Sequence, residues 1–270
     1  MKDPRDIFSE KFRHTYKIGK CLGFGSYGGV FMGVQPDLGR PVAVKALVRE
    51  RRQEEAERRF MQEAKLAARV EHANVVTVYD SGVDEGMPYI IYELVDGRSL
   101  DALLKEKPLG LNRVLRLMEQ IAQGVAAMHD VGVVHRDMKP DNILVDKRGQ
   151  VRITDLGIAK DGWCDGVKTA TGMVLGTPAY MAPEYFMDGS VTEVCDVYAL
   201  GVIFYEALAG RKPFQGTVLE MIEGHLKKTA PPLTAVPAPV ANLVGAMMQK
   251  EASKRPRAKQ LVEKLRKLQN

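Results

Sequence analysis

Residues 133–145 read Val133-Val134-His135-Arg136-Asp137-Met138-Lys139-Pro140-Asp141-Asn142-Ile143-Leu144-Val145, which matches the pattern H-R-D-x-x-x-x-N. Two shorter motifs follow in the chain, Asp155-Leu156-Gly157 and Ala182-Pro183-Glu184. A glycine-rich motif precedes them, Leu22-Gly23-Phe24-Gly25-Ser26-Tyr27-Gly28-Gly29-Val30. Four motifs in this order and at compatible spacings are hard to produce by chance, so we interpret them as parts of one functional unit.

The glycine-rich motif is a weak signal when taken alone. Glycines let the backbone approach phosphate oxygens closely, but a tight turn between strands uses the same residues. No Gly-Lys-Ser/Thr follows, so the motif is not a Walker loop. A dinucleotide-binding fold would place a helix directly after the glycines, whereas Val30–Val34 and Pro41–Leu47 have the pattern of strands.

A lysine and a glutamate follow the glycines at a suitable distance. Strand alternation over 41–47 puts Ala43 and Lys45 on the same face. Residues 49–70 have a helical pattern, with Glu63 beside the apolar stripe of that helix. An ion pair between Lys45 and Glu63 would hold the lysine ready for phosphate binding. The alternatives are a lysine that extends its stem along the strand and a solvated glutamate.

The two halves of the chain differ in their secondary-structure pattern. Short, glycine-punctuated stretches over 16–47, followed by 75–80 and 89–95, indicate strands, and Gly97 marks a break. Beyond this break helices dominate. One predicted helix carries an apolar stripe of Val114, Met118, Ile121, Val125 and Met128. Residues 197–209 are apolar on nearly every side, which predicts a helix buried in a core.

Composition excludes several classes of protein. The net charge of the 270 residues is only +5, and the basic stretches are interleaved with acidic residues, so we expect no nucleic-acid partner. Three cysteines build neither a disulfide framework nor a zinc site, which favours a reducing, cytoplasmic compartment. The N-terminus lacks an apolar signal core, and the longest apolar run is shorter than a membrane span.

Together the motifs resemble those of the protein kinase family, over nearly the whole chain. The resemblance implies an α+β, bilobal fold, with a small β-rich N-lobe that carries one regulatory helix and a larger, mainly helical C-lobe. We expect one kinase domain over 1–270, with the N-lobe and hinge at about 14–95 and the C-lobe at 96–270. The implied activity is phosphoryl transfer from ATP to proteins.

Lys139 and Thr177 match the Ser/Thr-specific members of the family. The stretches 79–82 and 88–97 resemble bacterial receptor-type Ser/Thr kinases, which act in signal transduction. In such proteins the kinase domain usually continues through a linker into one membrane span. By this resemblance the chain is the cytoplasmic, kinase part of such a protein.

The resemblance also implies the roles of individual residues. Asp137 would orient the substrate hydroxyl and accept its proton, with Lys139 beside it. Lys45 would bind the α- and β-phosphates, with Glu63 as its partner. The residues expected to bind ATP are Leu22, Gly23, Gly25, Gly28, Val30, Ala43, Lys45, Glu93, Val95 and Leu144.

Asn142 and Asp155 match the metal ligands of the family, and they offer the hard oxygens that Mg²⁺ prefers. Mn²⁺ is the alternative ion. Tyr92 falls at the position that gates the back of the nucleotide pocket.

Other residues match structural or regulatory positions. Arg255 is expected to pair with Glu184 and, like Asp196, to anchor the larger lobe, and His135 is expected to be a packing residue rather than a base. Thr169 and Thr171 are the expected sites of activating autophosphorylation, which a homodimer would carry out in trans.

Two other readings remain open on the sequence. A pseudokinase would keep the fold as a binding module, but such proteins have usually lost a catalytic position, and here all are present. A small-molecule phosphotransferase with the kinase fold would typically lack Ala182-Pro183-Glu184 and Gly176-Thr177-Pro178, and both segments are present.

Overall fold

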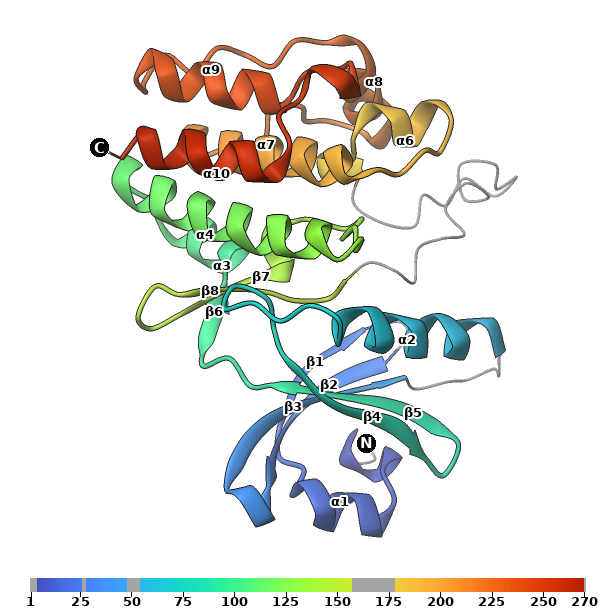
Figure 1. Ribbon diagram of the computed structural model, residues 1–270. Helices are drawn as coiled ribbons and strands as arrows, with labels where there is room; N and C mark the ends of the chain where they lie inside the picture. The colour runs from blue at the N-terminus through green and yellow to red at the C-terminus, as the bar shows by residue number, and fades with distance from the viewer. Residues whose placement is uncertain (1–3, 26–27, 48–53, 157–177, 270) are drawn as a thin grey trace. The chain divides into compact units, whose positions relative to one another are not determined.

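The computed structural model describes residues 4–25, 28–47, 54–156 and 178–269 (Figure 1). The chain divides into two compact units. The first consists of Met1–His72 and Val76–Asp96, and the second of Ala73–Val75 and Gly97–Asn270. The expected contrast between a β-rich part and a helical part is present in these units.

The first unit is built on a five-stranded antiparallel sheet in the order β1-β2-β3-β5-β4. Its strands are β1 (Cys21–Gly25), β2 (Gly28–Gln35), β3 (Arg40–Leu47), β4 (Val78–Asp84) and β5 (Met87–Glu93). The remaining elements are η1 (Pro4–Ile7), α1 (Glu10–Tyr16), η2 (Pro36–Leu38) and α2 (Glu54–Ala67). Thus β1 and β2 form a hairpin around the glycine-rich motif, as the strand pattern predicted.

The strands expected over 75–80 and 89–95 exist, but their bounds were wrong. They are joined by a hairpin turn at Glu85 and Gly86, both of which have positive φ angles, of 46° and 84°. The turn lets β4 run on to Asp84 and lets β5 start at Met87, so both strands lie closer to the turn than their apolar pattern indicated.

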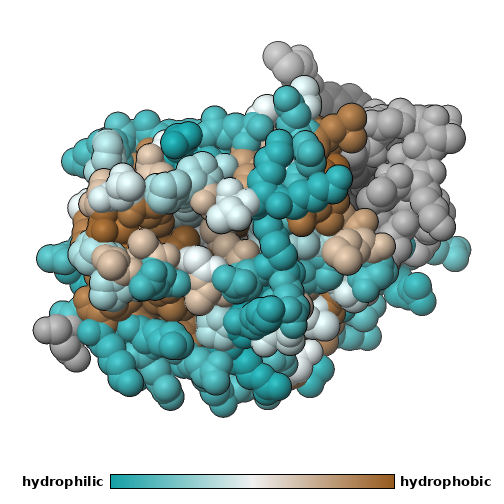
Figure 2. All heavy atoms as spheres, turned by 90° about the horizontal axis from the view of Figure 1, so that it is seen from above, coloured by the Kyte–Doolittle hydropathy of each residue, from teal (hydrophilic) through white to brown (hydrophobic). Residues whose placement is uncertain are grey.

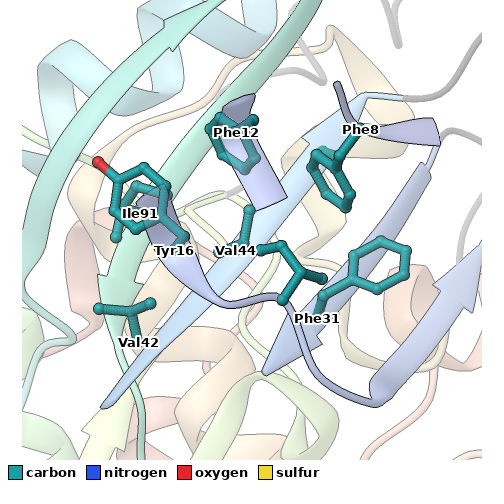
Figure 3. Packing of buried hydrophobic residues seen from close by; sticks show 9 residues of the cluster. Phe8, Phe12, Tyr16, Phe31, Val42, Val44 and Ile91 are labelled. Carbon is teal, nitrogen blue, oxygen red and sulfur yellow. The ribbon is translucent and has the colours of Figure 1, made fainter. Parts of the chain in front are cut away.

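The short helix α1 covers one face of the sheet, and the sequence pattern did not predict it. Phe8, Phe12 and Tyr16 pack onto that face, as Figure 3 shows, against the sheet residues Phe31, Val42, Val44 and Ile91. Ser9 caps the helix, since its hydroxyl accepts a hydrogen bond from the Phe12 amide at 3.1 Å. Asp84 at the end of β4 accepts the amide and the hydroxyl of Ser9 at 2.8 and 2.6 Å. These contacts fasten α1 to the sheet.

The opposite face of the same sheet packs against α2. Strand alternation separates the two faces, because Val42 and Val44 point to α1 while Ala43 and Lys45 point the other way. Phe60 and Ala64 of α2 are buried in this second cluster. The face that carries Lys45 is therefore the face that meets the helix with Glu63.

The second unit holds a three-stranded antiparallel sheet and most of the helices. Its strands are β6 (Gly97–Ser99), β7 (Ile143–Asp146) and β8 (Val151–Ile153), in the order β6-β7-β8. The helices are α3 (Leu100–Glu106), α4 (Leu111–Asp130), α6 (Pro183–Met187), α7 (Glu193–Ala209), α8 (Val218–Lys227), α9 (Ala238–Met247) and α10 (Ala258–Lys267). Short 3₁₀ turns are η3 (Pro140–Asn142), η5 (Pro178–Tyr180) and η6 (Ala252–Lys254).

Helix α7 is the centre of this unit and contacts α4, α9 and α10 (Figure 1). It is buried at nearly every position from Cys195 to Ala207, which confirms the expected core helix. The apolar stripe predicted for α4 is also buried. On the face seen in Figure 2, hydrophobic side chains lie between hydrophilic ones, as on most folded proteins. Among the residues described, no helix combines the length and apolar character that a membrane crossing requires.

Replacing Phe12 with alanine should lower the free energy of unfolding by about 3–5 kcal/mol, because removal of this buried ring leaves a cavity under α1. Chemical denaturation followed by circular dichroism measures the change. The matched control is Leu38→Ala, since Leu38 is 64% exposed, and a change within about 0.5 kcal/mol is expected there. A Phe12→Ala chain as stable as the parent would mean that α1 adds nothing to the stability of the first unit.

Candidate active site

The first unit contains a partly buried ion pair, between Lys45 and Glu63. Lys45 Nζ lies 2.7 Å from Glu63 Oε1, and the Glu63 side chain is only 5% exposed. Strand β3 directs the lysine to the face covered by α2, and Glu63 projects from that helix onto the same face. The ion pair predicted from the sequence is therefore present, and it gives the ammonium a defined position.

Tyr92 supports this pair in a way that the sequence did not indicate. Its hydroxyl donates a hydrogen bond to Glu63 Oε1 at 3.3 Å, and its ring packs in the cluster with Phe60 and Ile90. Tyr92 lies on β5 directly opposite Ala43 of β3. Tyr92 thus restrains Glu63 by a hydrogen bond, and its ring packs between the sheet and α2.

The expected ATP-binding residues of the first unit lie on neighbouring strands. In the register of the sheet, Gly25 is opposite Gly28, Gly23 is opposite Val30, and Val30 is opposite Lys45. The hairpin is tight at Gly29, where an added Cβ would lie 2.7 Å from the Phe24 ring. The other expected positions in this unit are Leu22, which is exposed, Ala43, Glu93 and Val95. Ala43 and Val95 pack against the cluster that contains Tyr92.

The second unit brings together three polar residues of the H-R-D-x-x-x-x-N stretch. Asn142 Nδ2 donates to the backbone carbonyl of Asp137 at 2.9 Å and to its carboxylate Oδ2 at 3.2 Å. Lys139 Nζ lies 3.2 Å from the same Oδ2. Two donors therefore hold one carboxylate, which fixes its orientation and balances its charge. Leu144, the remaining expected ATP-binding residue, follows on β7 and is half-buried.

Asp196 on α7 supports this loop from the core. Its carboxylate accepts the backbone N–H groups of His135 and Arg136, both at 2.9 Å, and the Nε2–H of His129 at 2.9 Å. Burial alone raises the pKa of Asp196, but the hydrogen bond and charge of His129 and the hydrogen bond from the His135 amide outweigh it, and the net shift is downward. Arg136 has a φ angle of 68°, a left-handed conformation that these hydrogen bonds help to hold.

His135 links the loop to the next motif. The Asp137 amide donates to His135 Nδ1 at 3.2 Å, so the ring proton lies on Nε2, which donates to the Thr154 carbonyl at 3.0 Å. The residue is fully buried. It therefore packs and connects segments, as expected, and is not placed to act as a base.

The pair Asn142 and Asp155 has the chemistry of a magnesium site. Both amide protons of Asn142 Nδ2 point to Asp137, so its Oδ1 lies on the other side of the amide. The Thr154 amide donates to the Asn142 carbonyl at 2.9 Å, which ties the residue before Asp155 to Asn142. Asp155 has a left-handed φ of 54°. Carboxylate and amide oxygens are the donors that Mg²⁺ accepts beside the phosphates of a nucleotide, so these residues fit the ion.

The second unit also contains an ion pair, between the buried Arg255 and the half-buried Glu184. Arg255 donates to both carboxylate oxygens of Glu184, at 2.6 and 2.8 Å, which confirms the predicted pair. Cys195 was not anticipated here, and its Sγ donates to Glu184 Oε1 at 3.1 Å. Burial raises the pKa of the Cys195 thiol to about 12, so it stays protonated and keeps this donor role. The pair joins α6 to the segment before α10.

Three threonines with expected roles, Thr169, Thr171 and Thr177, lie outside the described residues. The same holds for Gly157 and Cys164.

A family model for the protein kinase domain matches residues 16–265, and the chain belongs to the protein kinase family. The α+β fold implied by the resemblance is thereby confirmed. Members of this family use ATP and a divalent metal ion, generally Mg²⁺.

Curated relatives of the chain include bacterial Ser/Thr kinases. Serine/threonine-protein kinase PknA of Mycobacterium tuberculosis is 38% identical over 252 residues, which cover 90% of this chain and 58% of PknA. Serine/threonine-protein kinase pkn2 of Myxococcus xanthus is 36% identical over 256 residues, which cover 90% of this chain and 31% of that protein. Serine/threonine-protein kinase PrkC of Bacillus subtilis is 34% identical over 245 residues, covering 88% of this chain and 38% of PrkC. The chain thus spans 31–58% of the length of these relatives.

Replacing Asp196 with asparagine should lower the free energy of unfolding by about 2–3 kcal/mol, because charge-assisted hydrogen bonds to the loop are lost. The folded-state pKa of Asp196 is below its unfolded value. The stabilisation is therefore present above the unfolded pKa of about 3.9 and is lost as the pH falls through the lower folded pKa.

Chemical denaturation of the parent and of Asp196→Asn between pH 3 and pH 7 measures both effects, with the exposed Asp141→Asn as control. The asparagine variant should lose stability less steeply with acid than the parent. Equal acid dependence in the two chains would contradict the role assigned to Asp196.

Proposed function

We propose that this chain is an active, ATP- and Mg²⁺-dependent protein kinase that transfers the γ-phosphoryl group to Ser and Thr hydroxyls of proteins. The observation that carries the proposal is the fixed carboxylate of Asp137, held by Lys139 and Asn142 within one loop. Its setting has what phosphoryl transfer requires, namely an acceptor for the hydroxyl proton and a cation beside it. The relatives named as Ser/Thr kinases add support.

The mechanism follows from the chemistry of these side chains. Asp137 accepts a hydrogen bond from the substrate hydroxyl, orients its oxygen, and takes the proton as the new P–O bond forms. The bond from the γ-phosphorus to the oxygen that bridges to the β-phosphate breaks at the same time, and ADP leaves with that oxygen. Lys139 neutralises negative charge beside the Asp137 carboxylate. Lys45, held by Glu63, binds the α- and β-phosphates of ATP. Asn142 and Asp155 would hold Mg²⁺, which would neutralise phosphate charge when bound. We keep Mn²⁺ as an alternative ion for this site.

Two alternatives are less well supported. A binding module without turnover would not need the Asp137 carboxylate held by two donors. Nor would it need Lys45 held by Glu63, which Tyr92 in turn restrains. A small-molecule phosphotransferase would not need the peptide-site segment that ends in Ala182-Pro183-Glu184. Phosphopeptide formation, compared with phosphorylation of a sugar acceptor, separates the second alternative from the proposed activity.

Replacing Asp137 with asparagine should reduce peptide phosphorylation by about 10²-fold or more, because the proton acceptor is lost, while ATP affinity changes little. Single-turnover assays with labelled ATP and a separate ATP titration measure the two quantities. Asp141→Asn is the matched control, since Asp141 is exposed in the same loop, and its rate should equal that of the parent. An Asp137→Asn chain that keeps most of the parent rate would overturn this role.

We also propose that the chain activates itself by autophosphorylation at Thr169 and Thr171. In sequence they lie between Asp155-Leu156-Gly157 and Ala182-Pro183-Glu184, and the neighbour of Asp137 is Arg136. A phosphate adds nearly two negative charges, which a guanidinium can bind through two hydrogen bonds. A homodimer would allow the transfer between copies, so the rate of autophosphorylation should rise with protein concentration.

Phosphatase-treated protein incubated with ATP and Mg²⁺ should gain phosphate on Thr169 and Thr171 by mass spectrometry, together with at least about tenfold more peptide activity. The Thr169→Ala/Thr171→Ala variant should lack both gains, while Thr234→Ala, in an exposed loop, should keep them. Full activation of the double variant would rule out these two sites.

We further propose a cytoplasmic location and protein substrates, with no nucleic-acid partner. The interleaved charges support the absence of a nucleic-acid site, and the free thiols of Cys21 and Cys195 fit a reducing compartment. A gel-shift assay in which the chain binds DNA or RNA at physiological salt would contradict this proposal.

A further inference from the structure

His225 on α8 is a fully buried histidine that the mechanism does not use. The Tyr198 hydroxyl lies 3.0 Å from its Nδ1, and the Ala179 carbonyl lies 3.1 Å from its Nε2. A carbonyl can only accept, so Nε2 carries the proton and donates to Ala179. Nδ1 then accepts from the tyrosine. Both ring nitrogens are therefore committed, and the ring has one tautomer.

The surroundings keep this ring neutral. Lys250 Nζ donates to the carbonyls of His225 and Gly224 at 2.7 and 3.0 Å, and Arg255 lies over the Tyr198 ring at 4.8 Å. Burial, followed by the charge of Lys250, lowers the pKa of His225 to about 4. At neutral pH the ring therefore stays a donor to Ala179 and an acceptor from Tyr198.

Packing leaves the ring little freedom to move. Phe214 contacts it edge-on with ring centroids 4.9 Å apart, and Tyr198 does so at 5.7 Å. The backbone at Gly224 approaches so closely that an added Cβ would lie 2.6 Å from the Phe214 ring. The donor on Nε2 therefore has a defined place.

The acceptor of this hydrogen bond directly precedes residues that line the candidate active site. Ala179 is the middle residue of η5, and the next residues, Tyr180 and Met181, line a pocket together with Asp137 and Lys139. Tyr180 is also anchored, because its hydroxyl donates to Glu206 at 2.6 Å. In addition to the bond between Tyr180 and Glu206, the hydrogen bond from the His225 side chain to Ala179 connects η5 to α8.

We propose that His225 is a positioning residue for the protein substrate, which holds η5 through Ala179 at the place where the acceptor peptide must lie beside Asp137. This inference rests on the proposed kinase function. It assigns to α8 an effect on peptide binding that needs no contact between α8 and the peptide. ATP binding, which depends on Lys45 and Glu63, should not depend on it.

The test replaces His225 with phenylalanine and with glutamine. Phenylalanine keeps an apolar ring but removes the donor to Ala179, so KM for a peptide should rise about tenfold, the effect of one lost hydrogen bond. The KM for ATP should stay within about twofold. Glutamine places an N–H near the position of Nε2, so His225→Gln should recover most of the parent KM. His14→Phe is the control, since His14 is exposed on α1.

Amide hydrogen exchange supplies a readout that does not need activity. The amides of residues 179–181 should exchange faster in His225→Phe than in the parent, and His225→Gln should resemble the parent. A His225→Phe chain with unchanged peptide KM and unchanged exchange overturns the proposal, even if its melting temperature falls. If the parent phosphorylates no peptide, the proposed function fails, and the exchange data still decide whether His225 holds η5.

Discussion

The arrangement of the candidate active site in the second unit depends on the hydrogen bonds that the buried carboxylate of Asp196 accepts. It stands on α7, the most deeply buried helix, and it receives backbone N–H groups from His135 and Arg136. An isolated carboxylate in such a place would be strongly disfavoured in its charged form. Three donors remove that penalty and at the same time dictate the path of the loop that carries Asp137. The packing of α7 in the core thereby determines the position of the Asp137 side chain.

Two further buried side chains of the second unit hold short segments by hydrogen bonds in the same way. Arg255 holds Glu184 at the start of α6, and His225 holds Ala179 in η5. In each case a buried side chain on or next to a packed helix bonds to a short helical segment, of five residues in α6 and three in η5. Removing one partner leaves a buried polar group unsatisfied, which makes these links costly to break. Rigid elements thus support the segments that we propose to lie beside the substrate.

Much of the fold could be predicted because it is encoded locally. Alternation over 41–47 placed Lys45 on the same face as Ala43, and the uniformly apolar run at 197–209 identified a core helix. Helix α1 could not be predicted in this way. It has only seven residues, too few for periodicity, and a helix so short depends on packing against the sheet. Its stability comes from Phe12 and its neighbours, which contact strands distant in sequence.

The sequence by itself determined the family, the order of the motifs and the residue types that carry charge, since these depend only on identity and spacing. Only the tertiary structure decided which atoms meet. Asp196 and His135 are 61 positions apart, and His225 and Ala179 are 46 apart. Periodicity specifies which face of an element is apolar, but it contains no information on the partner across such a separation. The partner of each side chain is set by how α7 and α8 pack. Burial brings each donor to one acceptor and removes the water that would otherwise take the place of that acceptor.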